Sequence, residues 1–271
     1  MNEAEEKVSR FYNTVGWQIE EEITEDAKRY EDLRKNAKEY VSKCRLRVLK
    51  HIPQSGLNIL DMASGPIQYK EYLEYSKNFV KRYCIDLSME ALNQAKNKIG
   101  DHGVFLQGSF FNIPLEKDFF DCAISLHTIY HIDKEKQEEA IRKLLYVTKP
   151  GKPVIVVYGN PGTLITFLRF PLRMLTKIKI LLSRSKIDKN PDEKYDLYYY
   201  VYPIKWWKRF SDIATIKILP CRSFDSDTQK RIIPDNKIGK KLFDILFYLE
   251  DRFPNFFVSF FQYPMIILTK K

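Results

Sequence analysis

The sequence has no run of about 18 consecutive apolar residues, the length that a membrane-spanning helix requires. Its first residues, MNEAEEKVSR, are charged and contain no apolar segment of the kind found in secretory signal peptides. These two absences argue against secretion and membrane spanning. We therefore expect a cytoplasmic protein.

Cysteine and histidine are scarce, with four residues of each type. The cysteines, at positions 44, 84, 122 and 221, form no C-x-x-C pair and have no histidine at ligand spacing. The sequence therefore suggests neither a zinc site nor a disulfide framework, and we expect no metal site. A reducing compartment is consistent with this pattern.

Hydrophobic residues make up 44% of the 271 residues and charged residues 30%, and there are 18 Phe and 17 Tyr. This composition is typical of a soluble globular protein, and the length suits one enzyme-sized domain. The formal net charge of +10 favours anionic partners such as nucleic acid, anionic lipid or phosphorylated metabolites. The alternative is that the charge follows from a general compositional bias toward Lys, Ile, Asn and Tyr across the chain. The sequence leaves the oligomeric state open.

Short apolar runs alternate with longer helical patterns along most of the chain. This alternation predicts a doubly wound α/β fold, with a seven-stranded, mostly parallel sheet and helices on both faces. The predicted strands are 57–62, 81–88, 104–110, a fourth that runs into a loop within 121–132, 152–160, 214–221 and 263–270, and the helices between them are 69–79, 89–99, 134–148 and 238–253. We divide the chain into a helical N-terminal cap (1–50), a core (51–161), an insertion or lid after the fifth strand (162–212) and a C-terminal part of the sheet (213–271).

The stretch LDMASGPIQY (60–69) ends the first predicted strand in a turn of small residues. Small residues let a ligand approach the backbone and the following helix N-terminus. The turn contains one glycine and does not match the dinucleotide pattern G-x-G-x-x-G. With Asp61 in front, it resembles the D-x-G-x-G-x-G loop of the class I S-adenosylmethionine-dependent methyltransferases. Ala63, Gly65 and Ile67 stand at the three glycine positions.

Three later segments also resemble this family, in the same order along the chain. CIDLS places Asp86 at the end of the second strand, 25 residues after Asp61, where the family binds the ribose hydroxyls. GSFFNIPL and FDCAISLHTIYHI resemble the segments around the third and fourth strands, and KPGKPVIVVYGNP resembles the fifth. The resemblance implies S-adenosyl-L-methionine as cofactor, contacted by Asp61, Ala63, Ser64, Gly65, Asp86, Leu87, Ser88, Ser109, Phe110, Ser125 and His127.

His127, Tyr130 and His131 lie in the loop after the fourth predicted strand, beside the position expected for the transferred methyl group. If the acceptor is a hydroxyl or an ammonium, a base must remove a proton, and histidine titrates near neutral pH. We predict His131 as this base and Tyr130 as a residue that positions the acceptor. The alternative is that His127 only contacts the cofactor and His131 packs structurally.

In the resembled family, the N-terminal helices and the insertion after the fifth strand usually form the acceptor pocket. Aromatic walls with a few polar groups suit a small organic acceptor, such as a sugar, a methylated cation or a lipid-linked precursor. Aromatic residues at such spacing can equally belong to the core. The candidates are Tyr12, Trp17, Tyr30, Arg34, Tyr158, Asn160, Tyr199, Tyr202 and Trp206.

Residues 164–186 contain basic residues and no acid, and they read as a basic amphipathic helix. Such a helix can bind an anionic membrane surface, or it can cover the active site as a lid. One alternative function is therefore a membrane-surface binding module on a methyltransferase fold. A nucleic-acid methyltransferase is a third alternative, but we expect no nucleic acid as partner because the chain has no N-P-P-Y or D-P-P-Y motif for a flipped base and no appended RNA-binding module.

Overall fold

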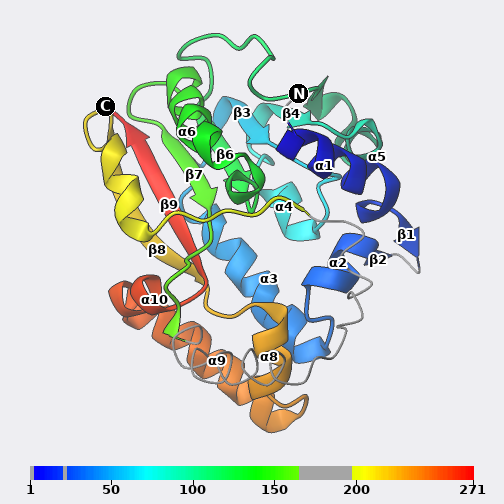
Figure 1. Ribbon diagram of the computed structural model, residues 1–271, viewed down its shortest axis with the longest axis vertical. Coiled ribbons are helices and arrows are strands. Elements are labelled where there is room, and N and C mark those ends of the chain that lie inside the picture. The colour runs from blue at the N-terminus through cyan, green and yellow to red at the C-terminus, as the bar shows by residue number, and fades with distance from the viewer. Residues whose placement is uncertain (1–2, 21–22, 165–196) are drawn as a thin grey trace, which may run out of the picture.

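The computed structural model describes residues 3–20, 23–164 and 197–271. Its seven-stranded sheet has the order β5-β4-β3-β6-β7-β9-β8. The first five strands in this order are parallel, and β9 runs antiparallel to both of its neighbours. This confirms the predicted α/β fold (Figure 1). The strands are β3 (Gly56–Met62), β4 (Phe79–Asp86), β5 (Gly103–Gln107), β6 (Cys122–Leu126), β7 (Pro153–Val157), β8 (Ala214–Arg222) and β9 (Tyr263–Lys270).

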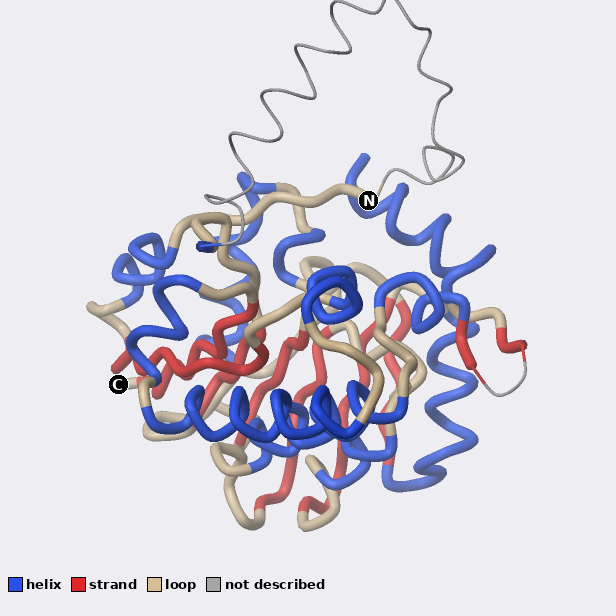
Figure 2. Tube along the Cα trace, turned by 90° about the horizontal axis from the view of Figure 1, so that it is seen from below, coloured by secondary structure: helices blue, strands red, loops and turns tan. Residues whose placement is uncertain are grey.

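The central strands are apolar on both faces because helices cover both sides of the sheet, as Figure 2 also shows. Successive side chains of a strand point to opposite faces. Leu60 accordingly joins the core cluster that contains Ile141 of α6, while Ile59 joins the cluster that contains Val48 of α3. Both strand residues are fully buried. The sheet is therefore the middle layer of three.

The helices around the sheet differ in length and include two that the sequence did not predict, α8 and α10. The helix predicted over 69–79 is much shorter: α4 ends at Glu74, and Tyr75 packs under the sheet in the core instead. The helices are α1 (Glu3–Phe11), α2 (Glu25–Tyr30), α3 (Lys35–Leu49), α4 (Lys70–Glu74), α5 (Met89–Ile99), α6 (Lys134–Val147), α8 (Ser226–Ile232), α9 (Lys237–Arg252) and α10 (Pro254–Phe260).

The prediction that the first fifty residues are helical holds only in part. A π-helical turn (Tyr12–Gly16) follows α1, and the short strands β1 (Ile19–Glu20) and β2 (Ile23–Thr24) form a hairpin before α2. The β-branched residues of this hairpin favour extended backbone over helix.

The structure bears on three further features of the sequence: the basic segment, the apolar content of its helices and the cysteines. The basic segment 164–186 lies outside the described residues except for Leu164. Within the described part of the chain, no helix is long and apolar enough to cross a membrane. All four cysteines are buried as free thiols, so none is part of a disulfide.

Candidate active site

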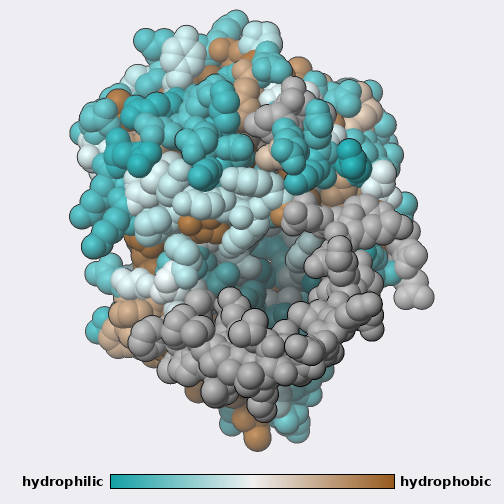
Figure 3. Space-filling model, in the orientation of Figure 1, coloured by the Kyte–Doolittle hydropathy of each residue, from teal (hydrophilic) through white to brown (hydrophobic). Residues whose placement is uncertain are grey.

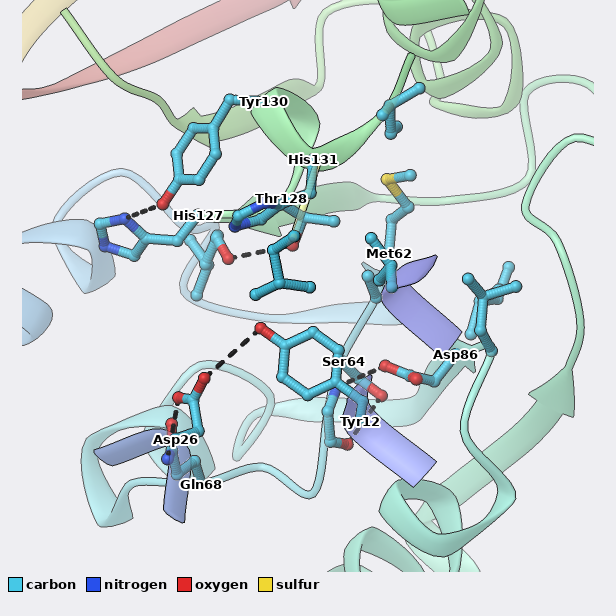
Figure 4. Close-up of a pocket in the computed structure, with 18 of the residues that line it drawn as sticks. Tyr12, Asp26, Met62, Ser64, Gln68, Asp86, His127, Thr128, Tyr130 and His131 are labelled. Atoms are coloured by element: carbon cyan, nitrogen blue, oxygen red, sulfur yellow. Dashed lines mark hydrogen bonds between the residues drawn. The ribbon is translucent and has the colours of Figure 1, made fainter. Parts of the chain in front are cut away.

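A cavity of about 950 Å³ opens at the carboxyl edge of the sheet. Its walls come from the loops after β3, β4 and β6, from the N-terminal segment, and from the regions around residues 199, 222 and 263. Tyr12, Asp86, Tyr130 and His131 are among the lining side chains that Figure 4 labels. Doubly wound sheets bind their ligands at this edge, so the cavity is the candidate active site.

The loop after β3 holds three residues in left-handed backbone: φ is 56° at Ala63, 55° at Gly65 and 50° at Ile67. These are the three positions at which the resembled motif has glycine. A side chain in this conformation costs about 1–2 kcal/mol, so Ala63 and Ile67 are held there by their surroundings. The Ile67 side chain is buried against Cys84 and Leu92 and does not line the cavity. The loop therefore keeps the turn without blocking the site.

Substituting Gly65 tests how closely Trp17 packs on this loop. A Cβ at Gly65 would lie 3.0 Å from the Trp17 ring, whereas a Cβ at Gly100, where φ is 50°, would meet nothing within 4 Å. Gly100→Ala therefore adds backbone strain alone, about 1–2 kcal/mol. We expect Gly65→Ala to lower the free energy of unfolding by a further 1 kcal/mol or so, because the indole must move. Urea denaturation compares the two, and equal losses would contradict the Trp17 contact.

Asp86, the last residue of β4, is half-buried and lines the cavity. Its Oδ2 accepts a hydrogen bond from the Gly65 N–H at 2.8 Å, and its Oδ1 accepts one from the Ser88 N–H at 2.9 Å. Burial raises the pKa of Asp86 to about 6. Each carboxylate oxygen can accept a second hydrogen bond, so the group can still receive two ligand hydroxyls. Leu87 also lines the cavity, while Ser88 caps α5 by accepting from Ala91 N–H at 3.2 Å.

Asp61 does not line the cavity, contrary to its predicted role in cofactor contact. Its carboxylate pairs with the Arg82 guanidinium, with Nε of Arg82 at 3.1 Å from Oδ2, and a second bond runs from Nη2. Both side chains are buried, and Arg82 also donates to the carbonyl of Tyr72. The Asp61 carboxylate is therefore committed to a structural ion pair beneath the loop.

The other predicted cofactor residues divide in the same way. Phe110 lines the cavity, as do Ala63, Ser64, Gly65 and His127, but Ser109 and Ser125 do not. The Ser109 hydroxyl donates to the carboxylate of Glu5, which comes from α1 and does line the cavity. The Ser125 hydroxyl is fully buried and points to the Met62 sulfur at 3.4 Å.

Aromatic side chains of the N-terminal segment form one wall of the cavity. Tyr12 and Trp17 stack with ring centroids 4.6 Å apart and an interplanar angle of 20°, and Tyr30 lines the same cavity. The Tyr12 hydroxyl donates to Asp26 Oδ1 at 3.4 Å (Figure 4). Asp26, which sequence reasoning missed, also lines the cavity, and burial raises its pKa to about 6.

His127, Tyr130 and His131 come together on the opposite wall. His127 has left-handed backbone, with φ at 60°, and its Nδ1 lies 3.1 Å from the Tyr130 hydroxyl (Figure 4). The His131 Nδ1 donates to the carbonyl oxygen of Tyr198 at 2.8 Å. Burial lowers the pKa of both histidines, and the charge of Arg222 adds to this effect at His127. Neutral His131 therefore carries its free lone pair on Nε2.

Of the predicted acceptor residues, Tyr12, Trp17, Tyr30 and Tyr199 line the cavity. Five others do not, because other parts of the fold use their polar or aromatic groups; these are Arg34, Tyr158, Asn160, Tyr202 and Trp206.

Two of these five residues are kept out of the cavity by polar partners elsewhere in the fold. The Arg34 guanidinium pairs with Asp32 at 2.6 Å and donates to the carbonyl of Ile233. The Asn160 amide donates to backbone carbonyls at the end of α10, including that of Phe261 at 3.0 Å. Neither side chain is available to an acceptor.

Core packing explains the other three. The fully buried Tyr158 donates its hydroxyl to Gln137 Oε1 at 2.6 Å. Tyr202 stacks on Trp206 with ring centroids 4.7 Å apart. Tyr158 and Trp206 both belong to the core cluster on the α6 side of the sheet. The alternative that these aromatic residues are core is therefore correct.

A third part of the cavity wall, formed by Glu31, Arg222 and Tyr263, carries an ion pair that the sequence did not predict. Arg222 Nη1 lies 2.7 Å from Glu31 Oε2, and the Arg222 guanidinium lies 4.8 Å from the centre of the Tyr263 ring. All three residues line the cavity. Arg222 and Tyr263 meet because β8 and β9 pair antiparallel, and Glu31 reaches them from the end of α2. No local sequence pattern indicates this meeting.

Comparisons with known proteins agree with this geometry. Residues 60–156 match the family model described as "Methyltransferase domain". An uncharacterized methyltransferase of Geobacillus sp. (strain WCH70) is 29% identical over 86 residues, which are 32% of this chain and 39% of that protein. The match thus spans about two fifths of the relative's length.

Two solved structures show the same fold over most of the chain. Geranyl diphosphate C-methyltransferase from Streptomyces coelicolor A3(2), in complex with Mg²⁺, geranyl diphosphate and S-adenosyl-L-homocysteine, has a TM-score of 0.58 at 13% identity, covering 100% of this chain and 99% of that one. Phosphoethanolamine N-methyltransferase 2 from Haemonchus contortus, in complex with S-adenosyl-L-methionine, has a TM-score of 0.52 at 12% identity, covering 84% and 52%. Residues 60–156 thus match a methyltransferase domain, and the sheet order and the two solved structures show that the chain has the Rossmann-like fold of class I methyltransferases.

Proposed function

We propose that the protein is an S-adenosylmethionine-dependent methyltransferase that acts on a hydroxyl or an amine of a small molecule. One observation carries this proposal. A single cavity joins the turn at Gly65 and the Asp86 carboxylate on one wall with His127, Tyr130 and His131 on the other.

The residues at the ends of β3 and β4 fit an adenosyl cofactor. The Asp86 carboxylate can accept further hydrogen bonds from ribose hydroxyls, and Leu87 and Phe110 offer apolar contact to a ring. The carboxylates of Glu5 and Asp26 on the same cavity suit a cationic sulfonium. When bound there, S-adenosylmethionine supplies a methyl group that the sulfonium charge makes electrophilic. The proposed cofactor residues are Ala63, Ser64, Gly65, Asp86, Leu87, Phe110 and His127.

His131 is the proposed proton acceptor. Its Nδ1–H is fixed on the Tyr198 carbonyl, so the Nε2 lone pair is the one left for an acceptor O–H or N–H. Tyr130, held by its contact with His127, would orient the acceptor group. Orientation matters here because methyl transfer is an in-line displacement and depends on alignment.

The remaining walls favour a small organic acceptor. Tyr12, Tyr30, Tyr199 and Tyr263 provide aromatic surface, and the Arg222–Glu31 pair adds polar groups at one end. We propose that the N-terminal cap and the segment around Tyr199 enclose this acceptor. A sugar ring or the head group of a lipid-linked precursor would suit such walls.

The test of the function is acceptor discovery. The purified protein is incubated with S-adenosylmethionine and fractions of a small-molecule extract, and each fraction is followed by mass spectrometry. We expect protein-dependent S-adenosylhomocysteine together with a singly methylated small molecule. Methyl transfer to RNA in place of any small molecule would contradict the proposal.

His131→Ala tests the proposed base once that acceptor is known. We expect kcat to fall about a hundredfold, since general base catalysis typically contributes 10²–10⁴, while the Kd for S-adenosylhomocysteine stays nearly unchanged. The matched control is His102→Ala, because His102 lies outside the cavity and contacts Ser76 at 3.1 Å. Parallel losses of kcat and cofactor affinity in His131→Ala would assign His131 a structural role.

A further inference from the structure

Helices α9 and α10 expose large apolar side chains on their outer surface. In α9, Ile238, Leu242 and Ile245 are 65%, 40% and 54% exposed, and their steps of four and three residues place them on one helix face. In α10, Phe256 and Phe260 are 50% and 43% exposed and lie one turn apart. The α9–α10 apolar face comprises Ile238, Leu242, Ile245, Tyr248, Phe253, Phe256 and Phe260, all of them exposed.

This face is additional to the one that packs α9 on the protein. The inner side of α9 buries Phe243, which stacks on Tyr40 of α3 with ring centroids 5.0 Å apart. That contact already gives the helix its place in the core cluster with Val41 and Cys44. A second apolar side is not needed for folding, and exposed apolar patches of this kind mark interaction surfaces.

Basic residues accompany the apolar face. Lys241, Ile245, Tyr248 and Arg252 follow steps of four, three and four residues, so cations occur in the same row as apolar side chains. Lys237 and, at the end of α8, Arg231 are also exposed. In the described ranges, no carboxylate lies within ion-pair distance of Lys237 or Lys241.

The acidic residues of α9 point to α3 instead. Asp244 pairs with Lys43 at 2.9 Å, and Asp251 pairs with Arg47 at 2.9 Å. Both bases belong to α3. The α9–α10 apolar face therefore presents apolar and positively charged groups, while the carboxylates of the same helix are neutralised on its other side.

The chain topology places this face at the same edge of the sheet as the cavity. Helices α8, α9 and α10 connect Arg222 to Tyr263, and both of these residues line the cavity. Figure 1 shows the three helices together beyond the ends of β8 and β9, and Figure 3 shows hydrophobic residues at the surface over α10.

We propose that the α9–α10 apolar face binds the surface of an anionic lipid bilayer. The apolar side chains enter the boundary between head groups and acyl chains, and the lysine and arginine side chains bind lipid phosphates. A second copy of the chain fits this face less well. A two-fold contact would bring the same patch of both copies together, so Lys241 and Arg252 would face the positively charged residues of the other copy and repel them. Bound in this way, the protein holds the carboxyl edge of its sheet near the lipid.

Vesicle co-sedimentation tests this surface without any need for methyl transfer. The full chain is mixed with vesicles of phosphatidylcholine alone, or of phosphatidylcholine with phosphatidylglycerol. We expect binding to the anionic vesicles only, weakened by salt, and reduced at least about tenfold in Ile245→Ser/Phe256→Ser. Leu57→Ser/Val80→Ser is the matched control and should bind like the wild type. Leu57 and Val80 are 60% and 59% exposed but lie at the amino ends of β3 and β4, the opposite edge.

Two results would overturn the proposal. One is equal vesicle binding by the wild type and Ile245→Ser/Phe256→Ser, which would place the contact elsewhere, for example in the basic segment 164–186. The other is a wild type that binds no vesicle; light scattering that then shows a dimer, made monomeric by the same substitutions, would identify a second copy as the occupant. Each variant is expected to fold, because every substituted side chain is exposed. Circular dichroism checks this.

Discussion

Asp86→Ala is expected to lower the affinity for S-adenosylhomocysteine at least a hundredfold or so. Hydrogen bonds to a charged group contribute about 1.5–3 kcal/mol each, so two ribose hydroxyls would lose roughly 3–6 kcal/mol, and each 1.4 kcal/mol is a factor of ten. Isothermal titration calorimetry above pH 7 measures this loss. Asp86→Asn is the control for shape, because it keeps one acceptor oxygen, and we expect an intermediate loss.

The pH dependence of the affinity for S-adenosylhomocysteine tests the role of the Asp86 carboxylate in a second way. The pKa of Asp86 is raised to about 6, so the ionised acceptor is present above this pH and is lost as the pH falls through it. Affinity should therefore be flat above pH 7 and fall below pH 6. The pKa of Asp26 is also raised to about 6, so its ionisation could contribute to the same pH dependence. Repeating the measurement with Asp26→Asn removes that contribution and leaves the one from Asp86. An unchanged affinity in Asp86→Ala would show that the ribose binds elsewhere.

Asp61→Asn is expected to lower the free energy of unfolding by about 3 kcal/mol, because breaking a buried ion pair costs about 3–5 kcal/mol. The loss arises because the Arg82 guanidinium is left buried without its carboxylate partner. Urea denaturation measures the effect. Affinity for S-adenosylhomocysteine in the folded fraction should change far less than in Asp86→Ala.

A double-mutant cycle separates the ion pair from other effects of the substitution. Arg82→Met alone should cost about as much as Asp61→Asn, and the double variant should cost less than the sum, because neither charge is then left buried alone. If Asp61→Asn kept full stability but lost cofactor affinity, Asp61 would contact the cofactor directly, as the motif predicts.

The sequence predicted all seven strands of the main sheet because short apolar runs and longer helical patterns differ in period. The same reasoning placed Asp86 and Gly65 at the site, since the carboxyl ends of parallel strands meet at one edge. It failed for elements whose structure depends on packing. Nothing local indicates that the helix after Tyr69 ends at Glu74, or that a hairpin precedes α2.

The site residues that were missed share a physical reason. Arg222 and Tyr263 face the cavity only because β9 inserts antiparallel beside β8, and Asp26 and Glu31 only because the N-terminal segment folds over the sheet. Asp61 shows the opposite error. Its motif position suggested a ligand contact, but the parallel pairing of β3 and β4 brings Arg82 to it.

A crystal structure with S-adenosylhomocysteine would test the central claim most directly, namely that an adenosyl donor binds where β3 and β4 end. We predict density for the ribose with both hydroxyls within hydrogen-bond distance of the Asp86 carboxylate and the homocysteine sulfur facing the wall formed by Tyr130 and His131. Saturating ligand that leaves this cavity empty, or that binds at another place on the protein, would contradict it.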